Sequence, residues 1–304
     1  MKRLFYIIFL FVCSAFCVSL QAQGDLLLSQ EIFSRVNKNP AATGNTDDID
    51  IFLHGRLQWL GVDNGPRTVV LNVTDYEDAA KSGFGFSFAY DQIGVGHHTV
   101  DAKVAYSYQI GLGDRNVLSL GLAAGVYVGS HDYLANTVDD ETEREEEEGL
   151  NQKMRECSPD FDFGIEYSNL YCTFGLSFTH LFNGESTPFK SGRHFYLYGT
   201  GLIPLNENVD LSPIVAFMHH RMTNLVEFGS LLFINRTLWG GLTWRPDFRH
   251  QVDPSVLVFT LGFEHKKFRF GYSYDLDLGS SSQLSSNTHE VILSYGIGKN
   301  KKKN

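Results

Sequence analysis

Hydrophobic and polar residues alternate along most of this chain, and the pattern is clearest near the C-terminus. From Phe268 to Leu276 every even position is aromatic or aliphatic, and every odd position is charged, polar or glycine. From Thr288 to Ile297 the alternation returns with its apolar residues on the odd positions. A period of two predicts β-strands with one apolar and one polar face. Such an apolar face packs on the core of a soluble sheet or contacts lipid in a membrane barrel.

The same alternation predicts strands along the rest of the chain. In the first of them, Ile51 and Leu53 lie on one face, whereas His54 and Arg56 lie on the other. Pro213 lies inside a predicted strand, and its missing amide hydrogen leads us to expect a bulge there. We expect fourteen strands, at about 48–59, 67–76, 83–91, 98–110, 117–129, 159–167, 170–181, 193–203, 210–219, 225–234, 237–246, 254–264, 268–276 and 288–297.

The connections between these strands alternate between longer loops and mostly tight turns such as Ser168-Asn169 and Asn235-Arg236. On the clearer strands the apolar face carries no Lys or Arg near its middle. Both features are typical of an outer-membrane barrel with short periplasmic turns and longer extracellular loops. We therefore predict an all-β fold, a single transmembrane barrel over residues 48–297. A soluble two-sheet sandwich is the alternative, because it shows similar alternation.

The two ends of the chain do not follow the strand pattern. Residues 1–22 combine a basic start, an apolar run and a cleavage site after Ala22, which predicts a secretory signal peptide. Residues 23–47 contain Asn-Pro and Thr-Gly turn signals, so we expect a segment at the periplasmic entrance or partly inside the barrel. We expect residues 298–304, which are rich in lysine, to form a periplasmic tail. Export and alternation together predict the outer membrane as the location.

Composition and the absence of certain motifs exclude several classes of function. The net charge of −10 argues against a nucleic-acid partner. Cys157 and Cys172 are the cysteines beyond the leader, and on two strands joined near residue 168 they lie too far apart to bond. The sequence contains no phosphate-cradling glycine loop and no metal-ligand spacing of Cys and His. We therefore expect no enzyme activity, cofactor or metal.

Several charged or titratable groups invite a functional hypothesis. His289 and Glu290 are neighbours on a strand, so they point to opposite faces and cannot act together. The pairs at 97–98 and 219–220 offer two histidines each, and we interpret them as rim histidines because no third metal ligand is nearby in sequence. The run at 139–148 holds eight carboxylates and one arginine. It could bind cations or a basic partner, but such runs are usually solvated.

A structural charge cluster is the strongest site hypothesis. Arg56, Asp275 and Glu290 lie on the polar faces of the first, thirteenth and fourteenth predicted strands. Closing the barrel makes these three strands neighbours, because the first and last strands must pair. We therefore predict a lumenal cluster across this seam, in the extracellular half, that pins the register and narrows the lumen.

Three groups of residues, in this order and spacing, resemble the PorP/SprF family over nearly the whole mature chain. The N-terminal group comprises Asn39-Pro40-Ala41 with Gly44, the box Arg56-Leu57-Gln58-Trp59, and Gly65-Pro66-Arg67-Thr68. The middle group comprises Asp91-Gln92-Ile93-Gly94 and Leu118-Ser119-Leu120-Gly121. The C-terminal group comprises Gly271-Tyr272-Ser273-Tyr274-Asp275 and Thr288-His289-Glu290 with Leu293 and Tyr295. The long acidic loop and the end at Ile297-Gly298, where a terminal aromatic residue is typical, depart from the family pattern.

This resemblance implies a non-enzymatic outer-membrane component of the type IX secretion system of Bacteroidetes. It implies a role in export or surface anchoring of cargo, often linked to gliding motility, with lipid, periplasmic or lipoprotein ring components and cargo as partners. Two alternatives come from other classes. A passive porin or small-ligand uptake channel would need an open lumen, and a lipid-modifying barrel enzyme would need a nucleophile on the outer face.

Overall fold

The computed structural model describes residues 28–46, 48–131, 154–182, 191–220, 223–247, 253–279 and 287–298. The signal peptide, the acidic run at 139–148 and the lysine-rich tail, all expected from the sequence, lie outside these ranges. Two short 3-10 helices, η1 (Glu31–Phe33) and η2 (Pro40–Ala42), precede a series of antiparallel strands. In the described residues, no helix is long and apolar enough to cross a membrane.

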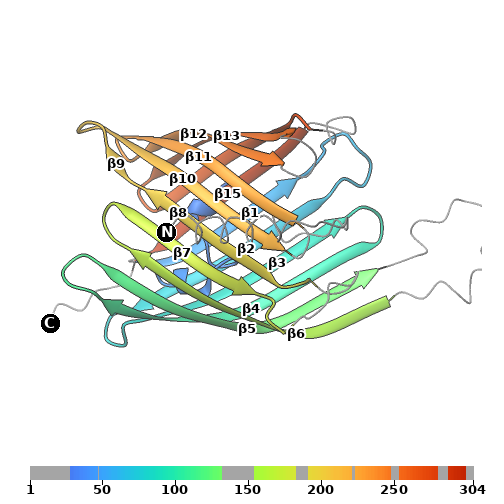
Figure 1. Ribbon diagram of the computed structural model, residues 1–304, viewed down its shortest axis with the longest axis horizontal. Helices are drawn as coiled ribbons and strands as arrows, with labels where there is room; N and C mark the ends of the chain where they lie inside the picture. Colours follow the sequence, from blue (N-terminus) through green and yellow to red (C-terminus); the bar gives the residue numbers. More distant parts are fainter. Residues whose placement is uncertain are drawn as a thin grey trace, which may run out of the picture.

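The strands form one closed antiparallel sheet (Figure 1). Apart from the short β9, which pairs only with β10, each strand pairs with one strand on either side. β8 pairs with β10, β10 with β11 and β15 with β1, so the barrel closes. The two-residue β9 continues the line of β8 along β10, which confirms the prediction of a fourteen-stranded barrel. The strands are β1 (Ile49–Leu57), β2 (Arg67–Glu77), β3 (Ser82–Ile93), β4 (His97–Gly111), β5 (Val117–His131), β6 (Met154–Ser168), β7 (Cys172–Thr179), β8 (His194–Gly201), β9 (Ile203–Pro204), β10 (Val209–His220), β11 (Thr223–Ile234), β12 (Leu238–Asp247), β13 (Asp253–His265), β14 (Phe268–Asp277) and β15 (Asn287–Ile297).

Pro213 does not produce the expected bulge. β10 pairs with β8 up to Ile214 opposite Thr200, and with β9 from Leu211 opposite Ile203, in the same register on both sides of the gap. Proline cannot donate to this ladder. The pairing with β10 is interrupted locally at this point, while Leu202 donates its amide hydrogen to the carbonyl of Tyr171 at 2.6 Å and so continues the register of β7 with β8.

The hairpin of β5 and β6 is longer than the sequence predicts. β6 begins at Met154, paired with His131, and not near residue 159. Charged residues and Pro159 conceal the alternation there, because apolar residues are not needed where a strand extends beyond the lipid. Cys157 and Cys172 lie on the adjacent strands β6 and β7 and are both free thiols, as expected.

The two barrel faces have the chemistry that the alternation predicts. On β1 the side chains of Leu53 and Leu57 are 40% and 45% exposed on the outer face, whereas His54 and Arg56 are buried in the lumen. Lumenal side chains on the other strands are also largely small or polar, for example Ser107 and Ser119, which are fully buried. The apolar exterior and the polar interior define a barrel that contacts lipid.

The two ends of the barrel differ in their connections. We define the turn end by the connections 78–81, 112–116, 169–171, 205–208, 235–237 and 266–267. We define the loop end by the opposite set, 58–66, 94–96, 132–153, 180–193, 221–222, 248–252 and 278–286. The first strand therefore runs from the turn end to the loop end, and the last strand ends at the turn end.

The depth of the apolar exterior generates a stability prediction. Leu122 is 60% exposed on β5, and its distance from the turn end is about half the length of a strand that crosses the lipid. Leu170, in contrast, lies in a turn. Leu122→Arg should lower the free energy of unfolding in lipid vesicles by about 2–4 kcal/mol, and Leu170→Arg by about 0–1 kcal/mol. Urea titration of both variants measures this difference. Equal effects would contradict the assignment of Leu122 to the lipid midplane.

Candidate functional site

Residues 28–46, which we call the plug, lie inside the barrel (Figure 1). The plug is largely buried: Asn39 and Ala41 have no exposed surface, and Gln30 has 1%. η2 contacts β4, β5 and β6. The plug begins near the loop-end half of β15, where Ser29 contacts Glu290. It then descends to the turn end, where Ser107 of β4 donates to the carbonyl of Thr43 at 2.7 Å.

The Asn-Pro-Ala-Ala sequence forms the base of the plug. The Asn39 side chain caps η2 by accepting a hydrogen bond from the amide of Ala41 at 2.9 Å, and Pro40 occupies the first helical position, where no amide hydrogen is required. The other end of the Asn39 amide donates to the carbonyl of Ile165 at 3.1 Å and to the hydroxyl of Tyr198 at 2.9 Å. One side chain therefore both shapes the plug and attaches it to the wall.

Glycines on the wall allow this close approach. A Cβ at Gly121 would overlap the backbone of Pro40 and Ala41, and one at Gly164 would overlap the Asn39 side chain. Glycine is required at these positions because the backbone and a side chain of the plug occupy the space of a Cβ, and not because of the backbone dihedral angle φ. The inward-facing glycines of β5 and β6 therefore form a seat for η2.

A buried ion pair holds the middle of the plug. Arg35 faces Glu166 of β6 with Nε–Oε2 and Nη2–Oε1 distances of 2.9 and 3.1 Å. Glu166 has no exposed surface and also accepts hydrogen bonds from Tyr198 and Asn45. A two-point guanidinium–carboxylate contact fixes orientation as well as distance. The ion pair thus fixes the plug in one position against β6.

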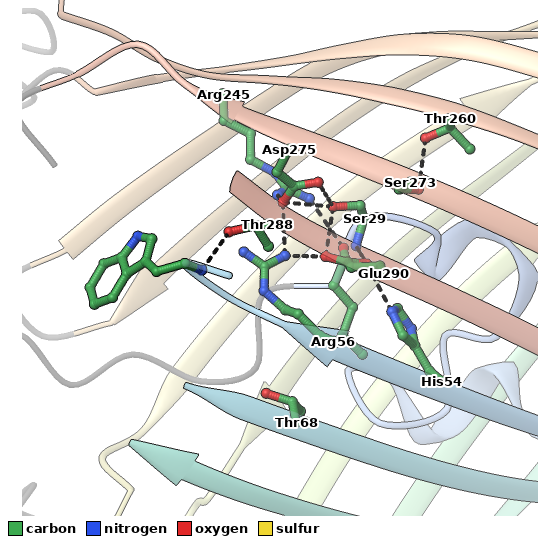
Figure 2. A network of polar contacts seen from close by, with 12 residues as sticks. Ser29, His54, Arg56, Thr68, Arg245, Thr260, Ser273, Asp275, Thr288 and Glu290 are labelled. Carbon is green, nitrogen blue, oxygen red and sulfur yellow. Dashed lines mark hydrogen bonds and ion pairs between the residues drawn. The ribbon is translucent and has the colours of Figure 1, made fainter. Parts of the chain in front are cut away.

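The structure brings the three seam residues of the sequence hypothesis together (Figure 2). Arg56 Nη1 lies 2.8 Å from Asp275 Oδ2 and also contacts Glu290 Oε1. Arg56 and Glu290 are directly opposite each other in the pairing of β1 with β15. Ser29 of the plug joins them, because its amide donates to Glu290 at 2.7 Å and its hydroxyl to Asp275 at 2.9 Å.

Three further residues, which were not predicted from the sequence, extend the seam cluster. His54 Nε2 lies 2.8 Å from Glu290. Arg245 of β12 bonds Asp275 at 3.2 Å, the carbonyl of Leu28 at 3.2 Å, and Glu227 of β11. Two guanidinium groups thus face three carboxylates, with His54 beside them. Glu227 and Arg245 occupy inward-facing positions in the alternation of their strands, which the sequence shows. Their strands lie apart from the seam strands in the sheet, so the sequence provides no reason to connect them with Arg56.

Most of the remaining family-signature residues lie along the same seam. Gln58 donates its backbone amide to the carbonyl of Pro66, and Trp59, at φ 55°, donates its amide to the hydroxyl of Thr288. The Tyr272 hydroxyl lies 2.6 Å from His289 Nδ1. Similarly, Tyr274 donates to Asn287 at 2.7 Å. At the opposite end of the barrel Gly44 has a φ of 76°, which glycine adopts easily.

A second charge cluster lies on the opposite wall of the lumen. Lys103 Nζ lies 3.0 Å from Asp101 and 2.8 Å from both Asp160 and Asp162. Asp101, Asp160 and His180 bring potential metal-ligand atoms within 4.8 Å of one another. The ammonium group of Lys103 already supplies the cation that these carboxylates require. This arrangement, which was not predicted from the sequence, combines residues from two strands and one loop.

The two histidines of each predicted pair, 97–98 and 219–220, lie on opposite faces of the sheet. His98 contacts the hydroxyl of Tyr90, whereas His97 packs against His131. His219 bonds Asn224 on the exposed face, but His220 is buried and stacks on His194 with ring centroids 4.0 Å apart. Neighbours on a strand point to opposite faces, so neither pair acts as one site.

The geometry defines a class of protein: a closed, lipid-facing β-barrel whose lumen is occupied by its own N-terminal segment. Among solved structures, the monoaromatic hydrocarbon channel CymD is similar, with a TM-score of 0.52, 10% identity, and coverage of 90% of this chain and 94% of that one. The Acinetobacter baumannii outer-membrane protein Omp33 is also similar, with a TM-score of 0.50, 10% identity, and coverage of 82% and 98%. These similarities concern the fold.

The sequence profile of the type IX secretion system membrane protein PorP/SprF matches residues 20–295. The chain belongs to the PorP/SprF family, as the sequence motifs predict, and is therefore an outer-membrane protein. A search of curated proteins finds no match.

The seam cluster generates a second stability prediction. Arg56→Met leaves Glu290 and Asp275 buried without this guanidinium group, so the free energy of unfolding should fall by about 3–5 kcal/mol. Arg236→Met is the control, because Arg236 pairs with Asp210 on the rim while its side chain is 82% exposed. The control should lose less than about 1 kcal/mol. Urea titration in vesicles, with heat-modifiable mobility as the readout of folded barrel, compares them. Similar losses would contradict a structural role for the cluster.

Proposed function

We propose that this protein is a non-enzymatic component of the type IX secretion machinery that assists the export or surface anchoring of cargo, in some settings linked to gliding motility. Its partners are the periplasmic or lipoprotein ring components of that machinery and the secreted cargo. Membership of the PorP/SprF family supports this role. The loop end then faces outside, and the turn end, with the lysine-rich tail, faces the periplasm.

The observation that carries the proposal is the plug. Arg35 and Ser29 attach the plug to opposite parts of the wall through buried charged partners, Glu166 on one side and Glu290 on the other. A lumen blocked in this way is unsuited to the passage of an exported protein. The barrel therefore acts as an anchored partner of the export machinery, and its contacts with cargo and ring components lie at its two rims.

We propose a matching structural role for the seam cluster. Arg56 bridges the first strand to Glu290 on the last, and Ser29 ties the plug to the same carboxylate. The cluster pins the register of the closing strand pair and holds the start of the plug. Acting through geometry alone, it requires no bound cofactor.

A passive porin is the second candidate function, because the fold is shared with a protein described as a channel. The plug counts against it, since conduction requires an open path through the lumen. The lipid-modifying enzyme would require a nucleophile and base together on the outer face. In the described strands, that face carries mainly aliphatic and aromatic side chains.

The secretion role is tested by mass spectrometry of secreted and surface proteins from a strain lacking the gene, compared with its parent. Loss of proteins that carry type IX sorting domains supports the proposal. The breadth of that loss separates general machinery from a helper of one cargo. An unchanged set of secreted proteins, with altered solute uptake, would favour the porin.

Plug displacement provides a direct test of the closed lumen. The wild-type barrel in a planar lipid bilayer should show little conductance. Gly121→Val places a branched side chain where Pro40 and Ala41 lie, and should raise the conductance several-fold by displacing η2. Gly111→Val is the matched control, because a Cβ at Gly111 meets no atom within 4 Å. A wild-type barrel that conducts as freely as the Gly121 variant would contradict the plugged state.

A further inference from the structure

An apolar cavity lies beside the plug on the β8–β11 side of the lumen. It is partly open to solvent. Small-molecule sites are lined mainly by apolar and aromatic groups. The side chains that define this cavity are Ile32 and Phe33 of the plug, and Tyr196, Ile214, Met218 and Leu231 of the wall.

The position of the plug explains why this space exists. Ser34 and Asn37 bond Asn72 of β2, and Val36 packs against alanines of β4 and β5. Ser29 is held at β14 and β15. These contacts draw the plug toward one wall and leave the opposite wall partly uncovered.

The uncovered wall is apolar in a lumen that is otherwise mainly polar. Ile214, Ala216 and Met218 are successive inward-facing positions on β10, with Leu231 on the neighbouring strand β11. On β1 to β6, buried lumenal positions are mostly polar, small or charged. A continuous apolar strip that faces the lumen has no contact with lipid, so its chemistry suits an apolar guest.

The cavity also has a charged edge, where Arg35 and Lys38 lie with Glu31 and Glu227. Lys38 lies in its lining, with Nζ 5.5 Å from the centre of the Tyr196 ring, and pairs with Glu31. The two charged side chains of this pair are each 13% exposed, in contrast to Glu166 and Glu290, which have no exposed surface. The carboxylate of a guest could therefore replace Glu31 at Lys38 more easily than it could replace the fully buried carboxylates.

We propose that this cavity binds a small aromatic carboxylic acid, with its ring against the β10 strip and its carboxylate at Lys38. The aromatic lining suits a ring, because offset or edge-to-face contacts with Phe33 and Tyr196 are favourable. The barrel and the plug enclose the site, which excludes a folded protein as the guest. This site is additional to the proposed secretion role and does not depend on it.

The test is isothermal titration of the purified full chain in detergent with 4-phenylbutyrate at neutral pH. Ala216→Trp fills the cavity from β10 and should abolish binding. Val215→Trp, the adjacent residue with 46% exposure on the outer face, adds the same bulk outside and should bind as the wild type. No binding to the wild type, or equal binding to both tryptophan variants, would overturn the proposal.

A second pair of binding measurements tests the role of Lys38. Lys38→Met should weaken 4-phenylbutyrate binding about tenfold or more, since a hydrogen bond to a charged group contributes about 1.5–3 kcal/mol. Binding of the neutral probe 4-phenylbutanol should be unchanged by the same substitution. If Lys38→Met leaves the affinity for the carboxylate unaltered, the assignment of the anionic group to this end of the cavity is wrong.

Discussion

The contact of Arg56 with Glu290 and Asp275 is the interaction on which the rest of the structure depends. It joins the first strand to the last two, and through Ser29 it joins all three to the plug. Ions removed from bulk water are tolerated only when they are paired and hydrogen-bonded. Closure of the barrel and seating of the plug therefore satisfy the same buried charges. Neither arrangement is complete without the other.

Because the plug and the barrel share these buried charges, the plug covers some walls of the lumen and leaves another wall partly uncovered. The plug follows the walls that offer polar partners, from Glu290 past Asn72 to Glu166. Glycines at 121 and 164 bring η2 onto the same side of the lumen. The wall of β10 and β11 is apolar at Ile214, Met218 and Leu231, and the plug leaves a cavity there. The distribution of polar groups along the wall thus determines both the path of the plug and the position of the cavity.

Much of the barrel was predictable because its rules are local. Alternation identifies the strands, and closure places Arg56 beside Glu290 without knowledge of the intervening chain. The path of the plug was not predictable in this way, because it depends on which wall glycines leave room for Asn39. Lys103 and Arg245 were not predicted for a related reason. Lys103 on β4 reaches carboxylates on β6, and Arg245 on β12 reaches one on β14, so in each case the two strands do not pair and neither alternation nor strand pairing indicates the contact.

The plug also bears on where a barrel of this kind can act. The fold is similar to a channel, but channel activity requires a continuous path, and here charged residues of the wall hold the chain's own N-terminal segment across that path. Under the proposed secretion role, recognition then occurs at the rims or in the space that the plug leaves open. Lys38 and Glu31 belong to the plug itself. A guest that replaces Glu31 at Lys38 would therefore alter a contact within the plug. Binding in the cavity would in this way affect the segment that occupies the lumen.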